Sequence, residues 1–310
     1  MKAKKEYLIL FAVALVLVLY LLLHQSGRTL YELPKLQELK KAQITKITVS
    51  GPDTRVRLEK AGDKWKLMPE GYPAESSRVE NMTDIISSLT LTAMVSEAQN
   101  YSRYHLGEAK RIGVKAWAGQ ELLRSFAVGK PAPSRRHTFV KLADDPRIYH
   151  ARKNFRSRFT GGAGALRDKT VLAVDADTVR AIEIRHKDAK LRLERRQQAP
   201  SKKGLQGKTQ QQFIWEDKQG DEIAASKIEK LLKQLKSLDC QSFIDKREKP
   251  EFTNPIYTLA VDGKKSRTLS IFARKKADAD MYPAVSSEAA DPFYLSAAKA
   301  EAIMEAIGKE

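Results

Sequence analysis

Short stretches in which apolar and polar residues alternate recur along the chain, and this period of two predicts β-strands. One series follows residue 110 and a second follows residue 255, and within each series the gaps are short enough for antiparallel neighbours. Both series therefore predict meandering antiparallel sheets. The stretches are 111–117, 122–129, 137–142 and 147–151 in the first series, and 256–263, 266–273, 281–286 and 292–296 in the second.

A different period, close to 3.6 residues, appears where a serine-containing start is followed by a mixed apolar and polar run. In the second half of the chain one apolar stripe of a helix is formed by Ile228, Leu231, Leu232, Leu235 and Leu238. Helices are also predicted after each strand series, around 152–159 and 297–307. The pattern as a whole is that of an α+β protein.

The two halves repeat each other. "ITKITV" is matched by "VRAIEI", "RVRLEK" by "KLRLER", and "DKWKL" by "FIWED", so that Trp65 aligns with Trp215. The stretch 75–97 also matches 224–246 almost without gaps. We therefore predict two related antiparallel-sheet-plus-helix repeats, at 29–165 and 166–310, with the glycine-rich segment 160–170 near their junction. The two tryptophans are expected to be strand residues packed beneath the helices.

The second repeat carries an insertion of about 15 residues, approximately 197–212, between two strands of an antiparallel pair. It contains Gly207, Lys208 and Thr209, which resemble the end of a nucleotide-binding P-loop. The first glycine of that motif would have to stand at position 202, which is Lys202. The insertion is therefore either a solvated loop tip or a basic contact surface, and no nucleotide is expected there.

The N-terminus contains an unbroken apolar run, residues 7–23, preceded by Lys2, Lys4 and Lys5. A helix that spans a membrane needs roughly 17–25 such residues, whereas a cleaved signal core has about 7–15. The run favours an uncleaved signal-anchor over a cleaved signal peptide. We predict a cytoplasmic tail and transmembrane helix at 1–28, single-pass insertion in the inner membrane, and an extracytoplasmic, periplasmic C-terminal region.

The formal net charge is +18, from 56 Lys plus Arg against 38 Asp plus Glu, which favours an anionic partner. An extracytoplasmic location makes nucleic acid an unexpected partner and leaves anionic lipid headgroups or a cell-envelope polymer. The alternative for the stretch 147–158 is an amphipathic helix with solvated arginines. The residues predicted to contact an anionic surface are Arg147, Arg152, Lys153, Arg156, Arg158, Lys202, Lys203 and Lys208.

Patterns for catalysis and metal binding are scarce. The five histidines show no helical metal-ligand spacing, and the single cysteine, Cys240, can form no intrachain disulfide and is expected in the core. Ser296 and Lys299 fit the Ser-x-x-Lys pattern of acyl-transfer enzymes, but Ser296 also stands where a helix should begin, as a capping residue would. No catalytic residue, metal site or cofactor is therefore predicted.

The stretches 63–79, 104–116, 126–142 and 166–184 resemble the DUF4340 family of uncharacterised, single-pass extracytoplasmic proteins. The resemblance covers nearly everything after the N-terminal run and implies a duplicated α+β unit. Members of that family often accompany gliding-motility-type ABC transport systems, so the resemblance also implies an accessory or scaffold role. The family has no known catalytic residue to transfer. His105 stands here where the family usually has a small residue.

Three hypotheses follow. The first is a non-enzymatic, membrane-anchored accessory protein that makes protein–protein contacts in an envelope complex, such as subunits of an ABC-type transporter. The second is a binder of anionic envelope polymer or lipid headgroups through the basic surface. The third, a remote alternative, is an acyl-transfer enzyme that uses Ser296 and Lys299.

Overall fold

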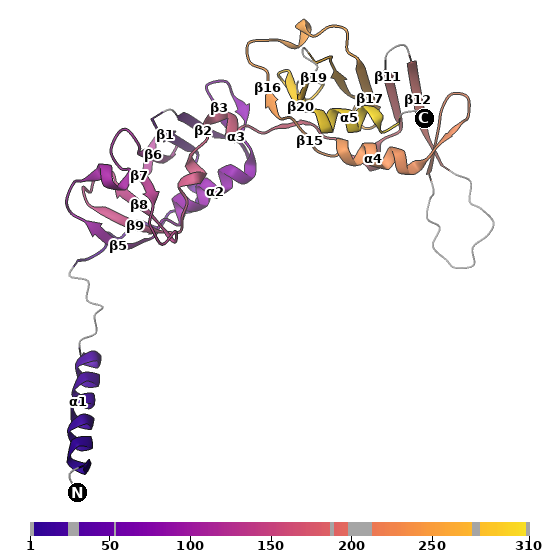
Figure 1. Ribbon diagram of the computed structural model, residues 1–310. Helices are drawn as coiled ribbons and strands as arrows, with labels where there is room; N and C mark the ends of the chain where they lie inside the picture. Colours follow the sequence, from indigo (N-terminus) through magenta and orange to yellow (C-terminus); the bar gives the residue numbers. More distant parts are fainter. Residues whose placement is uncertain are drawn as a thin grey trace. The chain divides into compact units, whose positions relative to one another are not determined.

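The computed structural model describes residues 3–23, 31–52, 54–186, 189–197, 213–274 and 280–307. In the first helix, α1 (Ala3–Leu23), it describes the side chains of residues 5, 7 and 9–20. The chain divides into two compact units, Met1–Arg167 and Asp168–Glu310, called unit 1 and unit 2 below (Figure 1). The repeat comparison placed the corresponding boundary between residues 165 and 166.

Unit 1 contains a nine-stranded sheet in the order β4-β3-β2-β1-β6-β7-β8-β9-β5, in which every neighbouring pair is antiparallel. Helix α2 lies along one face of it (Figure 1). The elements after α1 are η1 (Lys41–Gln43), β1 (Lys46–Ser50), β2 (Arg55–Ala61), β3 (Lys64–Met68), β4 (Tyr72–Pro73), α2 (Ser76–Ser87), β5 (Leu91–Ser96), η2 (Tyr101–Tyr104), β6 (Ile112–Ala118), β7 (Glu121–Pro131), β8 (His137–Leu142), β9 (Ile148–Arg152), η3 (Arg156–Phe159) and α3 (Gly162–Leu166).

Unit 2 contains a second nine-stranded antiparallel sheet, in the order β14-β13-β12-β11-β17-β18-β19-β20-β16, and a separate pair of β10 and β15. Its elements are β10 (Thr170–Leu172), η4 (Ala176–Thr178), β11 (Ala181–His186), β12 (Ala189–Gln197), β13 (Phe213–Glu216), β14 (Glu222–Ile223), α4 (Ala225–Leu235), β15 (Leu238–Asp239), β16 (Ser242–Phe243), η5 (Lys249–Glu251), β17 (Tyr257–Asp262), β18 (Arg267–Ile271), β19 (Met281–Ser286), β20 (Phe293–Ser296) and α5 (Ala297–Glu305).

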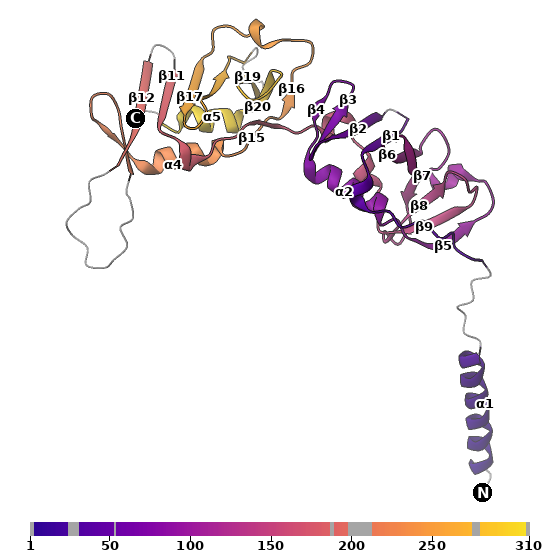
Figure 2. The ribbon, with the colours of Figure 1, turned by 180° about the vertical axis from the view of Figure 1, so that it is seen from behind.

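The two sheets have matching strand orders, since each begins at the two-residue strand before its helix, β4 before α2 or β14 before α4, and ends at a strand after that helix, β5 or β16 (Figures 1 and 2). The registers also correspond. Ile47 of β1 faces Leu58 and Ala116, and Ile182 of β11 faces Leu193 and Val261. This correspondence allows positions in the two units to be compared residue by residue.

The core of each unit lies between the sheet and its helices, because successive strand residues point to opposite faces and the apolar set faces one side. In unit 1, α2 buries Val79, Met82 and Ile86 against the sheet. In unit 2, α4 buries Ile228, Leu231, Leu232 and Leu235, which are four of the five residues predicted on one stripe.

Two local predictions need correction. Leu238 is buried, but it lies in β15 because α4 ends at Leu235. The helix predicted around 152–159 is instead the end of β9 followed by the short turn η3. Lys153 has a φ of 74°, in the left-handed region, which a continuous right-handed helix cannot contain. The apolar spacing of Phe155 and Phe159 was therefore a sign of burial and not of a long helix.

The predicted fold class is wrong in its first element. Within the described part of the chain, no helix has the length and apolar character needed to cross a membrane. We therefore correct the predicted transmembrane helix, the signal-anchor at 1–28 and the single-pass inner-membrane, periplasmic location. The structure consists mostly of antiparallel sheet with a few short helices.

Candidate functional site

Two of the predicted anion-contact residues are engaged within unit 1. Arg147 donates to both oxygens of Asp145, with Nη2 2.8 Å from Oδ2. Arg156 donates to the carbonyl oxygens of Val128 and Gly129 at 2.8 and 2.9 Å, and burial lowers the pKa of its guanidinium. Both side chains therefore stabilise the fold around β7 and β9, and neither has its full donor set available to a ligand.

Three other predicted residues, Arg152, Lys153 and Arg158, meet around one cleft of about 480 Å³. We call it the basic cleft. It lies between the C-terminal part of α2 and the turn that follows β9. Its other lining residues are Asn81, Asp84, Ile85, Ser88, Leu89, Thr90, Asn154 and Phe155.

The turn that carries these cations is fixed by a buried hydroxyl. Thr138, which is 0% exposed, donates through Oγ1 to the carbonyl of Lys153 at 2.9 Å and accepts from the backbone N–H of Phe155 at 3.1 Å. The backbone N–H of Arg152 also donates to the carbonyl of Thr90 at 2.9 Å. These contacts hold the left-handed conformation of Lys153 and place its neighbours at the mouth of the cleft.

The positive charges that line the basic cleft are not neutralised by acidic residues of the cleft. Its acidic residue, Asp84, pairs with Lys41 at 2.7 Å. Among the residues that the structure describes, no carboxylate forms an ion pair with Arg152, Lys153 or Arg158. Phe155 and Phe159 are buried on either side of Arg158 in sequence, so η3 is anchored in the core while Arg158 remains exposed.

The remaining predicted contacts, Lys202, Lys203 and Lys208, fall in the insertion, of which residues 198–212 lie outside the described residues. The structure therefore does not bear on the choice between a solvated tip and a basic contact surface.

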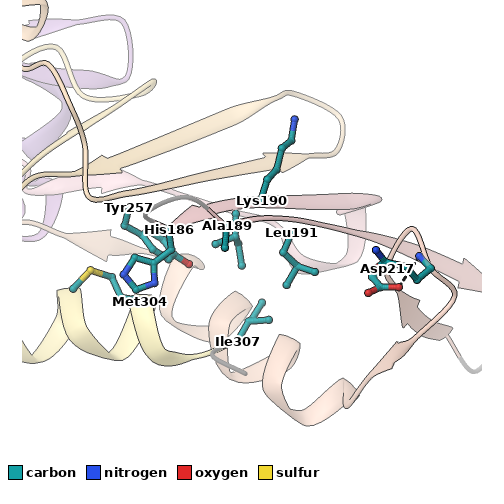
Figure 3. A pocket seen from close by; sticks show the side chains of 10 residues that line it. His186, Ala189, Lys190, Leu191, Asp217, Tyr257, Met304 and Ile307 are labelled. Carbon is teal, nitrogen blue, oxygen red and sulfur yellow. Dashed lines mark hydrogen bonds between the residues drawn. The ribbon is translucent and has the colours of Figure 1, made fainter. Parts of the chain in front are cut away.

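Unit 2 contains a second hollow, of about 320 Å³, which the sequence did not predict (Figure 3). It lies where β11, β12 and β17 meet the end of α5. We call it the unit 2 hollow. Figure 3 shows His186 beside Met304 and Tyr257, Leu191 near Ile307, and Asp217 at the far end. Its lining residues are Ile184, His186, Ala189, Lys190, Leu191, Asp217, Gln219, Tyr257, Met304 and Ile307.

Asp217 is unusual among the lining residues because it carries a carboxylate and is only 7% exposed. Its Oδ1 accepts from the backbone N–H groups of Gln219 and Asp221 at 2.8 and 2.9 Å, which closes the turn between β13 and β14. A repeat alignment could have identified it. The residue two positions after Trp65 is the core residue Leu67, and the residue two positions after Trp215 is Asp217.

The candidates for catalysis and metal binding are distributed as follows. Ser296 is the N-cap of α5 without a side-chain capping bond, and Lys299 donates to the carbonyl of Asp239 at 2.8 Å. In the described part of the chain, no hydrogen bond joins Ser296 to Lys299. Cys240 is buried in the core, as predicted.

Two histidines that are distant in sequence meet in unit 1. His137 and His150 stack with ring centroids 5.3 Å apart, and burial, together with the neighbouring His137, lowers the pKa of His150. Within the described ranges, no group of three or more His, Cys, Asp or Glu side chains could hold a metal ion. His105 has a φ of 56°, in the left-handed backbone region that favours glycine.

No curated protein and no solved structure matches the chain significantly. A family model, "Domain of unknown function (DUF4340)", matches residues 65–255, which is more than half of the chain. The match extends from Trp65 in β3 of unit 1 to the segment before β17 in unit 2, and it carries no information on ABC transport. The resemblance found in the sequence is thereby confirmed, and the chain belongs to the DUF4340 family.

Proposed function

We propose that this protein is a binding protein that holds a phosphate-bearing ligand in the basic cleft of unit 1. The observation that carries the proposal is the convergence of Arg152, Lys153 and Arg158 on one polar cleft, without an ion-pair partner among the described residues. Arginine forks match the geometry of phosphate oxygens, and a lysine adds a compact positive charge.

The rest of the cleft supports the same chemistry. Asn81, Ser88 and Thr90 add neutral polar groups to the lining, and the charge of Asp84 is already offset by Lys41. The turn that presents the cations is fixed by Thr138 before any ligand arrives. A fixed site loses less conformational entropy on binding than a mobile one, so ordering the turn adds little to the cost of binding.

The experiment is a calorimetric titration of the full chain with inorganic phosphate and pyrophosphate. Arg158→Gln and Arg152→Gln should each weaken binding by roughly tenfold to a hundredfold, because hydrogen bonds to charged groups contribute about 1.5–3 kcal/mol. Arg103→Gln is the matched control, since Arg103 is an exposed arginine of η2 away from the cleft. The affinity should also fall as salt rises.

Phosphate can be free or part of a lipid headgroup. Vesicles of phosphatidylcholine with and without phosphatidate therefore form a second arm of the experiment. Binding to phosphatidate vesicles that depends on Arg158 would identify a headgroup, whereas binding of free phosphate alone would identify a soluble ligand. Equal affinities of wild type and Arg158→Gln in both arms would refute the proposal.

The accessory role in a transport complex, which the family resemblance implied, stays a prediction. Its test is cross-linked co-purification with a transporter permease or ATPase.

A further inference from the structure

The unit 2 hollow has the composition of a small-ligand site. Its walls are largely apolar, from Ile184, Leu191, Met304 and Ile307, and the aromatic ring of Tyr257 closes one side. A volume of about 320 Å³ is near the lower end of the range of ligand pockets, about 300–1,000 Å³. Such a space suits a short aliphatic chain better than a drug-sized or polymeric ligand.

One end of the hollow carries a buried carboxylate. Asp217 uses Oδ1 to accept two backbone N–H groups. In the part of the chain that the structure describes, no donor reaches its Oδ2 and no cation pairs with it. Figure 3 shows the carboxylate at the end of the hollow beyond Leu191 and Ile307. A carboxylate in largely apolar surroundings is stabilised by a charge of opposite sign beside it, so this end of the hollow favours a cation.

The cations and ionisable groups nearby do not fill that role. Lys190 lines the hollow, but its amine pairs with Glu183 at 3.2 Å and points away from the hollow in Figure 3. His186 lies at the opposite end, where its ring contacts that of Tyr257 with centroids 5.8 Å apart. The described lining therefore offers one carboxylate and an apolar passage leading to it.

The corresponding position of unit 1 shows that the fold itself does not require a carboxylate. Trp65 faces Lys60 and Trp215 faces Arg195 in equivalent strand pairs, so Leu67 and Asp217 occupy corresponding positions. Leu67 is 2% exposed and belongs to the apolar core of unit 1. Unit 2 thus carries an acid where the same topology accepts a leucine.

We propose that the unit 2 hollow binds a small aliphatic ammonium ion. The alkyl chain lies between Leu191, Ile307 and Met304, and the ammonium group donates to Oδ2 of Asp217. This site is separate from the basic cleft of unit 1, and its ligand has the opposite charge.

The test is a calorimetric titration of the full chain with n-hexylamine, which is protonated at neutral pH, and with n-hexanol and hexanoate as probes of equal chain length. The ammonium should bind about tenfold more tightly than the alcohol, and hexanoate should bind most weakly. Asp217→Asn should remove the preference for the ammonium over the alcohol. Its amide oxygen can still accept the backbone N–H groups of Gln219 and Asp221, so the turn is retained.

Asp221→Asn is the control, because it makes the same charge change at an exposed position of the same turn. It should leave the affinity for n-hexylamine unchanged. A second variant, Leu191→Phe, fills the hollow without touching Asp217 and should abolish binding of both the ammonium and the alcohol. Equal binding of ammonium and hexanoate, an unchanged ammonium preference in a folded Asp217→Asn, or binding that survives Leu191→Phe would overturn the proposal.

Discussion

Arg124 in unit 1 and Arg267 in unit 2 occupy corresponding positions, because each faces the strand residue that pairs with the central isoleucine, Ile47 or Ile182. Arg124 is buried and donates to the carbonyls of Ile86, Ser87 and Gln37, so it caps the end of α2 and holds the segment before η1. In unit 2 the same residue type pairs with a carboxylate.

The partner of Arg267 is Glu288, at 2.7 Å, and Glu288 also accepts from the backbone N–H of Ala173 at 2.8 Å. Unit 1 therefore uses an arginine to satisfy a helix end, whereas unit 2 uses it to attach the segment after β10. The two units share a strand order, but the long-range partners of equivalent residues differ. Sites of opposite charge can arise on one topology for this reason.

The largest expected effect comes from exchanging the residue types of the two units at the position two residues after the tryptophan, Leu67 and Asp217. Leu67→Asp should lower the free energy of unfolding of unit 1 by roughly 3–5 kcal/mol, because it leaves an uncompensated charge in a packed core. Asp217→Leu should change unit 2 by no more than about 1 kcal/mol, since one turn is weakened while apolar area is gained. Hydrogen exchange measured separately for each unit would check this; equal losses would break the comparison.

The second prediction concerns the two arginines at corresponding positions, Arg124 and Arg267. Arg124→Ala should destabilise unit 1 by roughly 3 kcal/mol, because several carbonyl oxygens lose their donor at once. Arg267→Ala should cost unit 2 about 1 kcal/mol, since Glu288 is partly exposed and can be hydrated. Because the chain has two compact units, for which a single unfolding transition cannot be assumed, denaturant unfolding should be followed by hydrogen exchange in each. A larger loss for Arg267→Ala would contradict the assignment of roles.

The third prediction is the pH dependence that Asp145 contributes to the stability of unit 1. The hydrogen bonds from Arg147, with a further one from Tyr149, hold the pKa of Asp145 well below its usual range. The ionised carboxylate thus stabilises the folded state above its unfolded pKa of about 3.9, and this stabilisation is lost as the pH falls through the lower folded value.

Asp145→Asn should lower the stability of unit 1 by roughly 2 kcal/mol at neutral pH, with the difference from wild type shrinking in acid. Thermal unfolding of both proteins between neutral and acidic pH is the measurement. A constant difference across that range would show that Asp145 acts by packing alone.

The fourth prediction, which includes the smallest expected effect, compares the contributions of the Ser296 and Thr138 hydroxyls to stability. Ser296→Ala should change the stability of unit 2 by less than about 0.5 kcal/mol, because Ser296 makes no side-chain capping bond to α5. Thr138→Val should cost unit 1 about 1–2 kcal/mol, because Thr138 holds the turn at Lys153. It should also weaken phosphate binding in the basic cleft. Chemical denaturation and the phosphate titration together provide the readout.

Much of the local structure could be predicted because it depends on periodicity. The alternation at 137–142 and 281–286 corresponds to β8 and β19, and the stripe from Ile228 to Leu235 corresponds to the buried face of α4. The helix predicted at 152–159 was wrong because the left-handed turn at Lys153 depends on Thr138, which is distant in sequence. The transmembrane helix was predicted from a run of apolar residues. This prediction was wrong, because no helix among the described residues is long and apolar enough to cross a membrane.

The sequence by itself determined the basic charge, the internal repeat, the burial of Cys240 and the family to which the chain belongs. Only the tertiary structure separated Arg152, Lys153 and Arg158, which line a cleft, from Arg147 and Arg156, which bind internal partners. It alone brought Asp217 to the end of an apolar hollow. The physical reason is that periodicity fixes which face a side chain occupies, whereas its partners across the sheet depend on chain segments tens of residues away.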